Sequence, residues 1–179
     1  TTLDTTDKNV VESFHKYLAE VVEPAQVMED QLNKKLLASE LEPKGFEIQL
    51  RNMRADAAIF REANVPLSTD LQKIGTEYDQ VIGAQTVAWE GEEKTLTQMK
   101  PFLHSDDRAL REQVWKAISE RRLADRAKLN EIWGRMLPIR LQIAANAGQE
   151  TFRDFQWKAF KRFDYTPADC ETFHRAIEV

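Results

Sequence analysis

Residues 6–32, TDKNVVESFHKYLAEVVEPAQVMEDQL, decide the fold class of this chain. Apolar side chains recur there at alternating spacings of three and four residues, at Val11, Phe14, Leu18, Val21, Ala25, Met28 and Leu32. This is the period of one face of an α-helix. Pro24 has no N–H and crowds the preceding turn, so we expect a kink or a break there. The stretch therefore predicts a long helix with one apolar face.

The helical spacing continues along most of the chain. Apolar stripes cover residues 46–60 and 67–82, and the second stripe starts after Asn64-Val65-Pro66 and ends at Gly83. The longest predicted helix starts at Ser105-Asp106-Asp107 and runs to Leu137, which is roughly 48 Å at about 1.5 Å per residue. Two further helix starts are predicted. Residues 151–154 have the capping-box form, and residues 166–169 combine an N-cap, a proline at the first helical position and an acidic third residue.

One stretch breaks the helical period. Thr86, Val87 and Trp89 favour a strand, Glu90-Gly91 is a turn signal, and residues 94–96 can form a returning strand. The predicted fold class is therefore mostly α, a multi-helix array with one short β-hairpin near residues 85–96.

Composition excludes several classes of protein. The 179 residues carry 25 basic and 30 acidic side chains, a net charge of −5, which argues against nucleic acid as a partner. No apolar run is long enough to span a membrane, and no signal-peptide pattern opens the sequence. The lone cysteine, Cys170, indicates a reducing compartment, and we expect a cytoplasmic protein. His174 could activate Cys170 as a thiol nucleophile, but an ordinary helix cysteine is the preferred interpretation.

Metal-binding patterns are few among the three histidines. None belongs to a His-Glu-x-x-His pair, so we predict neither a metal site nor catalytic residues in this chain, and its substrate-binding residues stay unassigned. Glu12 with His15, and Glu171 with His174, both have the Glu-x-x-His spacing of di-iron carboxylate bundles. A di-iron protein is therefore one alternative, although a half-buried structural His15 explains the first pair equally well.

Two other groups could bind a ligand. The arginines between Arg121 and Arg126 could clamp a carboxylate or phosphate, but a solvated face with ion pairs, such as Glu120 with a nearby arginine, is preferred. Trp115, Trp133 and the aromatic residues of 152–163 could line a pocket, but aromatic residues at helical spacing are more often core. A stand-alone helical binding module is the other alternative function.

An ordered set of segments resembles one known family. The set has the order and spacing found in the N-terminal part of the oligoendopeptidase F branch of the thimet-oligopeptidase-like zinc metallopeptidases. The resemblance covers roughly Thr6 to Val179, and its segments are Leu50-Arg51-Asn52-Met53-Arg54-Ala55, Glu62-Ala63-Asn64-Val65-Pro66-Leu67, Trp89-Glu90-Gly91-Glu92-Glu93-Lys94-Thr95-Leu96, Ala117-Ile118-Ser119-Glu120-Arg121-Arg122 and Arg162-Phe163-Asp164-Tyr165-Thr166-Pro167-Ala168-Asp169-Cys170.

The resemblance implies a helical peptidase with a deep channel that admits short peptides. It also implies a zinc-binding His-Glu-x-x-His helix downstream of this sequence, with the motif glutamate as general base. We therefore expect residues 1–179 to be the helical, channel-wall N-terminal region, with the last helix truncated at Val179. Zinc is expected in the full-length protein, the partner is the missing C-terminal catalytic half, and this chain alone is predicted to be inactive.

Overall fold

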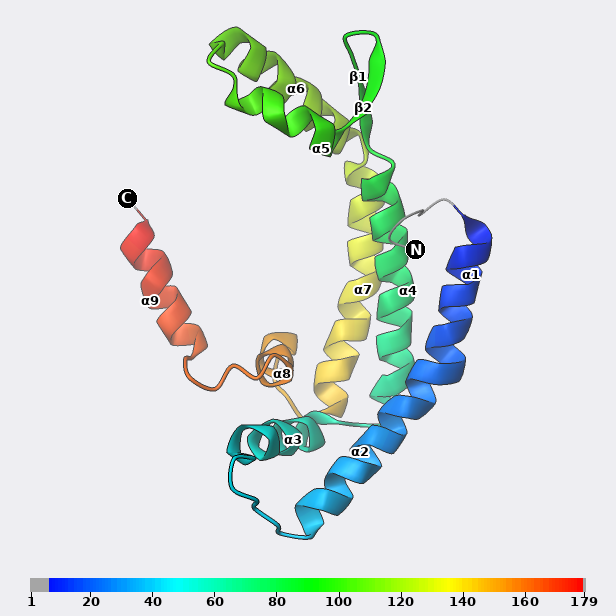
Figure 1. Ribbon diagram of the computed structural model, residues 1–179, viewed down its shortest axis with the longest axis vertical. Helices are drawn as coiled ribbons and strands as arrows, with labels where there is room; N and C mark the ends of the chain where they lie inside the picture. Colours follow the sequence, from blue (N-terminus) through cyan, green and yellow to red (C-terminus); the bar gives the residue numbers. More distant parts are fainter. Residues whose placement is uncertain (1–6, 179) are drawn as a thin grey trace. The chain divides into compact units, whose positions relative to one another are not determined.

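The computed structural model describes residues 7–178, and these form a mostly helical chain with one hairpin, as predicted (Figure 1). The chain divides into two units, residues 1–15 with 70–137, and residues 16–69 with 138–179. The elements in chain order are α1 (Lys8–Tyr17), a π-helical turn (Leu18–Val22), α2 (Glu23–Ala38), α3 (Glu47–Ile59), α4 (Asn64–Gly83), β1 (Thr86–Trp89), β2 (Glu92–Thr95), α5 (Leu96–Met99), a 3₁₀ helix (Lys100–His104), α6 (Arg108–Ala124), α7 (Arg126–Asn146), α8 (Phe152–Ala159) and α9 (Pro167–Ile177).

The predicted hairpin lies in the first unit. β1 and β2 are antiparallel, with Thr86 opposite Thr95 and Trp89 opposite Glu92. Glu90 and Gly91 connect them with φ values of 54° and 81°. Positive φ at both central residues twists a two-residue turn in the same sense as the strands, and Gly91 adopts it without a Cβ penalty.

An apolar core supports the hairpin. Met99 and Val114 are fully buried and Ile118 is 7% exposed. Val87, Trp89, Leu96, Phe102, Leu103 and Leu110 pack against these three residues. An isolated two-stranded hairpin is marginal in water, so this core, built from α5, α6 and the 3₁₀ helix, is what stabilises it.

The long helix predicted from residue 105 to Leu137 is wrong in one respect, because it is broken at Asp125. α6 ends at Ala124 and α7 begins at Arg126, and the two helices run in different directions (Figure 1). The Asp125 carboxylate accepts hydrogen bonds from Arg121, at 2.8 Å, and from the buried Gln85, at 2.9 Å. The polar stretch in the middle of the expected helix is therefore the corner at which α6 ends and α7 begins. The predicted start is confirmed, because the Asp107 side chain accepts a hydrogen bond from the Ala109 N–H at 2.8 Å.

Within the same unit, an ion pair joins α4 to α7. Both guanidinium ends of Arg135 donate to Glu77, at 2.6 and 2.7 Å, and Arg135 also donates to Glu131 at 3.1 Å. The bond from Arg135 lowers the pKa of Glu77. Two parallel charge-assisted bonds fix the relative rotation of the two helices at this level.

The expected irregularity at Pro24 is present as a π-helical turn, Leu18–Val22, directly before it. The Glu23 N–H donates to the Leu18 carbonyl, five residues back. Such a turn inserts one residue into the helix and moves every later side chain about 100° around the axis. The predicted apolar stripe is therefore interrupted: Leu18 is 1% exposed, but Met28 and Leu32 are 63% and 66% exposed.

Helix ends in the second unit follow the sequence signals. Thr151 with Asp154 forms the predicted capping box, and Thr166, the predicted N-cap of the last helix, forms one with Asp169. Gly148, at φ 67°, ends α7: its N–H donates to Ala145, and the Gln149 N–H donates to Ala144. This pair of bonds is a Schellman motif, which needs a left-handed residue at the glycine position.

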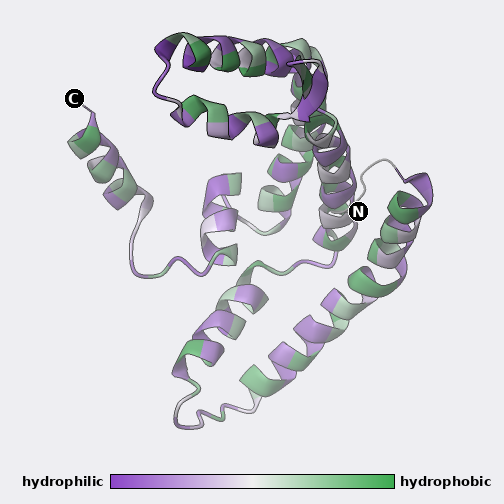
Figure 2. Cartoon of the chain, turned by 45° about the horizontal axis from the view of Figure 1, so that its top comes forward, coloured by the Kyte–Doolittle hydropathy of each residue, from purple (hydrophilic) through white to green (hydrophobic). Residues whose placement is uncertain are grey.

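Polar and apolar residues alternate along the helices in Figure 2, which is coloured by hydropathy. Among residues 7–178, no helix has the combination of length and apolar character that a membrane span requires.

Candidate functional site

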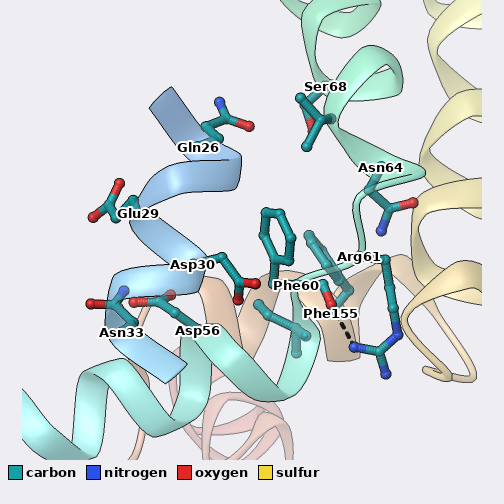
Figure 3. Close-up of a pocket in the computed structure, with 12 residues that line it drawn as sticks. Gln26, Glu29, Asp30, Asn33, Asp56, Phe60, Arg61, Asn64, Ser68 and Phe155 are labelled. Atoms are coloured by element: carbon teal, nitrogen blue, oxygen red, sulfur yellow. Dashed lines mark hydrogen bonds between the residues drawn. The ribbon is translucent and has the colours of Figure 1, made fainter. Parts of the chain in front are cut away.

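A polar cavity of about 310 Å³ lies within the second unit and is the candidate site (Figure 3). It is bounded by α2, the C-terminal end of α3, the first turns of α4, and Phe155 of α8. Figure 3 shows the side chains of α2 on one side and Asn64 and Ser68 of α4 on the other. Ile59, Val65 and Phe155 give the cavity an apolar wall.

The polar side of the cavity is one face of α2. Gln26, Glu29, Asp30 and Asn33 are spaced by three, one and three residues, which places them on one side of a helix. This face points into the cavity because the π-helical turn shifts the helix register by one residue. A straight helix would have carried Met28 and Leu32 on from Leu18 instead.

Asp30 is the most buried charged group of the cavity, with 8% of the residue exposed. Its carboxylate accepts a hydrogen bond from Lys34, one turn later, at 2.6 Å. The Lys34 ammonium also lies 5.3 Å from the centre of the Phe60 ring. A buried carboxylate and an aromatic face together stabilise an ammonium group, here the chain's own.

Asp56 and Arg61, which also line the cavity, are engaged within the chain as well. Lys161, which follows α8, pairs with Asp56. The Arg61 guanidinium donates to the carbonyls of Ala58 and Phe60, at 3.1 and 2.6 Å. A cation on the last carbonyls of α3 offsets the negative end of that helix.

Asn64 holds the start of α4 in place. Its amide donates to the Ile143 carbonyl at 3.0 Å, and its oxygen accepts from Asn146 at 2.8 Å. Asn64 is 6% exposed, and both bonds join segments about 80 positions apart, with separations of 79 and 82 residues. The cavity wall therefore has a fixed position relative to the end of α7.

The arrangement is suited to binding rather than to bond cleavage. Its free groups are the Gln26 and Asn33 amides, the Glu29 carboxylate and the Ser68 hydroxyl, which make no side-chain hydrogen bond with the described residues. They can donate to and accept from peptide groups, while the apolar wall takes an aliphatic or aromatic side chain.

The residues of the di-iron alternative lie on two helices. Glu12 and His15 are on α1 in the first unit, and Glu171 and His174 are on α9 in the second. No group of three or more His, Cys, Asp or Glu side chains that could hold a metal ion occurs within residues 7–178. The described residues thus offer no zinc or di-iron ligand set, and the di-iron alternative stays a prediction. Cys170 is half-buried on α9, and no hydrogen bond joins it to His174 in the described structure.

Two arginines of the stretch from Arg121 to Arg126, Arg121 and Arg122, have different surroundings. Arg121 forms an ion pair, as preferred from the sequence, but its partner is Asp125 rather than Glu120. Arg122 is exposed and lines a second cavity, in the first unit.

The expectation that the aromatic residues are core is wrong for several of them. Trp115 and Trp133 are 61% and 53% exposed, and Phe160 is 58% exposed. Val114, next to Trp115, enters the core together with Ile118 of the same helix. The spacing of apolar residues identified the turn of α6 that reaches the core, but it did not show which of the two neighbours, Val114 or Trp115, faces inward.

Sequence reasoning missed Asp30 and Asn64 as parts of the candidate site. The only signal for Asn64 was its place in the segment that opens α4. Asp30 could have been found only by assigning one extra residue to the turn before Pro24, because the resulting rotation of about 100° takes Met28 and Leu32 off the face of Leu18 and brings Asp30 onto it.

No protein-family model and no curated protein matches the chain. Solved structures do match: a chain from Bacillus anthracis str. Ames described as an oligoendopeptidase F aligns with a TM-score of 0.81, 19% identity, and coverage of 97% of this chain and 32% of that one.

Two further structures are similar to the chain over the same extent. Another chain described as an oligoendopeptidase F gives a TM-score of 0.86 at 22% identity, covering 97% of this chain and 31% of that one. PZ peptidase A, solved with an inhibitor, gives a TM-score of 0.86 at 23% identity, and the match covers 98% of this chain and 32% of that one. The fold implied by the sequence resemblance is confirmed, and the chain spans about a third of the length of these proteins.

Proposed function

We propose that this chain is the N-terminal, channel-wall portion of a zinc metallo-oligopeptidase that hydrolyses short peptides. One observation carries the proposal: nearly the whole chain aligns with part of two structures described as oligoendopeptidase F and with part of PZ peptidase A. The ordered sequence segments between Leu50 and Cys170 support it independently. A cytoplasmic location belongs to the same proposal and rests on the lone cysteine.

In this proposal the catalytic half is a further part of the same polypeptide. The zinc ligands and the general base come from that part, in keeping with the finding that no three His, Cys, Asp or Glu side chains among residues 7–178 cluster as a metal site would require. The role of the present chain is to bind and orient the peptide and to exclude folded proteins from the channel.

Exposed apolar side chains support a partner for the chain. The second unit exposes Met28, Leu32, Leu41 and Ile48 by more than 60% each, and the first unit exposes Trp115 and Leu123 to the same degree. Large apolar side chains gathered on a surface are typical of a face that another segment covers. We assign that role to the catalytic half.

Reading the coding sequence beyond Val179 is the first test. The proposal expects a His-Glu-x-x-His helix downstream, and a stop codon directly after Val179 would contradict it. The protein encoded by the whole reading frame should then hydrolyse a short quenched-fluorescence peptide, lose that activity in a chelator, and regain it with zinc. The matched control is the same protein with the motif glutamate changed to glutamine, which should bind zinc without cleaving the peptide.

The 179-residue chain is expected to be inactive in the same assay. Zinc-dependent cleavage by the purified 179-residue chain, at a rate that survives removal of trace proteases, would contradict its assignment as a non-catalytic wall.

A stand-alone binding module is the second candidate, and the polar cavity of the second unit is the observation that favours it. The two functions differ in what the isolated chain does. A binding module is monodisperse and unfolds cooperatively, whereas a channel wall without its partner self-associates and binds a hydrophobic dye. Sedimentation and dye binding on one preparation separate them.

A further inference from the structure

A second cavity, of about 610 Å³, lies wholly within the first unit. It is formed where the end of α4, the strand β2 with α5, and the corner between α6 and α7 come together. Ile82, Leu96 and Leu129 supply apolar walls, and Tyr78 supplies a phenol. Lys100 and Arg122 supply two positive charges.

The charge of this cavity is unusual for the chain. Acidic side chains outnumber basic ones, 30 to 25, yet no Asp or Glu belongs to the cavity wall in the described part of the molecule. The cavity therefore concentrates positive potential beside apolar surface.

Both cations are free of partners within residues 7–178. The two residues are exposed, and the side chains of Lys100 and Arg122 make no hydrogen bond or ion pair there. Their neighbours differ: Lys116 pairs with Glu112, Arg121 pairs with Asp125, and Lys94 pairs with Glu92. Lys100 and Arg122 are therefore available to a ligand.

The corner at Asp125 creates this availability. Arg121 and Arg122 are adjacent, so they project about 100° apart around α6. The Asp125 carboxylate accepts hydrogen bonds from the Arg121 guanidinium and from the Gln85 amide, so it is already engaged by two donors. Arg122 is left to face the cavity with its planar, forked guanidinium, which matches a carboxylate in two parallel hydrogen bonds.

We propose that this cavity binds the carboxylate of a small apolar acid, the chemical group found at the C-terminus of a short peptide with an aliphatic last residue. Arg122 and Lys100 hold the carboxylate, and Ile82, Leu96 and Leu129 contact the apolar body. The assignment depends only on the residues that line this cavity. It does not depend on the proposal that the chain is part of a peptidase.

Titration of the ¹⁵N-labelled chain tests the proposal directly. The probes are N-acetyl-L-leucine, its neutral amide N-acetyl-L-leucinamide, and acetate. We expect N-acetyl-L-leucine to bind at least about tenfold more tightly than the amide, because a charge-assisted bidentate contact is lost. It should also bind more tightly than acetate, which has no apolar body. Amide resonances of residues 95–100 and 122–129 should report the binding.

Two variants assign the charges. Lys100→Gln and Arg122→Gln should each weaken binding of N-acetyl-L-leucine by about three- to tenfold, because each removes one exposed cationic donor. Arg108→Gln, an equal charge change at an exposed α6 position outside the cavity wall, should leave it unchanged. Thermal unfolding of each variant verifies that the fold is kept.

Three results would overturn the proposal. They are equal binding of the acid and its amide, equal binding of acetate and N-acetyl-L-leucine, and an equal loss of affinity in Arg108→Gln and Arg122→Gln. The last would mean that general electrostatic attraction, rather than this cavity, holds the acid.

Discussion

The two units of the chain differ in what lies beside their apolar core residues. The hairpin unit has a core of Met99, Val114 and Ile118, with an aromatic pair, Trp89 and Phe102, whose ring centres lie 5.9 Å apart. The second unit also buries apolar side chains, Leu18 and Ile143 among them, and adds polar contacts at a similar depth, Asp30 with Lys34 and Asn64 with Asn146. Apolar packing tolerates loss of one contact in proportion to the volume removed, whereas buried polar pairs fail when either member is lost.

The difference also concerns where ligands can bind. In the cavity of the second unit the chain pairs Asp30 with Lys34 and Asp56 with Lys161, and Glu29 remains an unpaired carboxylate among the described residues. The cavity of the hairpin unit keeps two cations, Lys100 and Arg122, unpaired among the described residues. The cationic cavity is thus the one suited to an anion.

The largest expected effect tests the apolar core. Met99→Ala should lower the free energy of unfolding by about 2–5 kcal/mol, because a fully buried side chain leaves a cavity. Met28→Ala is the matched control, since Met28 is 63% exposed, and it should change the free energy by less than about 0.5 kcal/mol. Urea unfolding followed by circular dichroism measures both. Equal effects would mean that the core assignment is wrong.

The next effect tests the polar pairs of the second unit. Asn64→Ala should cost about 1–3 kcal/mol, because it leaves the Ile143 carbonyl and the Asn146 amide without their buried partner. Asn33→Ala, at a position without such bonds, is the control. Hydrogen exchange should show faster amide exchange at residues 143–149 in the first variant only. Unchanged exchange there would show that the Asn64 bonds do not fasten α4 to α7.

A smaller effect, on the ion pair between α4 and α7, depends on pH. Bonding to Arg135 lowers the pKa of Glu77 below its usual 4.5. A carboxyl group with a depressed folded pKa stabilises the fold above the unfolded pKa and loses that contribution as pH falls through the folded value. The wild type should therefore be more stable than Glu77→Gln by about 0.5–1 kcal/mol at pH 7, a difference that shrinks below pH 4.5.

Glu62→Gln is the control for that pH profile, because the Glu62 side chain makes no hydrogen bond or ion pair within residues 7–178. The difference in the free energy of unfolding between this variant and the wild type should not change from pH 7 to pH 3. If Glu77→Gln gives the same flat profile, the ion pair does not contribute to stability in solution.

The smallest effect compares two adjacent residues of α6. Trp115→Gln should change the free energy of unfolding by less than about 0.5 kcal/mol, since Trp115 is 61% exposed. Val114→Ala, one position earlier and fully buried, should cost about 1–3 kcal/mol. A large loss in Trp115→Gln would restore the sequence-based expectation that this tryptophan is core.

The local elements were predictable from the sequence, because their signals are local. Capping boxes at Thr151 and Thr166, and the Glu90-Gly91 turn, involve residues within three positions of each other. What failed depends on contacts distant in sequence. The break at Asp125 needs Gln85, 40 residues away, and the exposure of Met28 follows from one extra residue in the turn before Pro24. The candidate site combines both kinds of effect, so none of its central residues was predicted.

The hairpin described above has a consequence for self-association. A sheet of only two strands leaves the outer edge of each strand with unpaired backbone groups, and such edges template the addition of another strand. β2 consists of Glu92, Glu93, Lys94 and Thr95, so charges line its edge and disfavour that addition. β1, with Thr86, Val87, Ala88 and Trp89, has no charge of its own. Any aggregation through strand pairing should therefore begin on the β1 edge, and a lysine at Ala88, which is exposed, is the substitution that would suppress it.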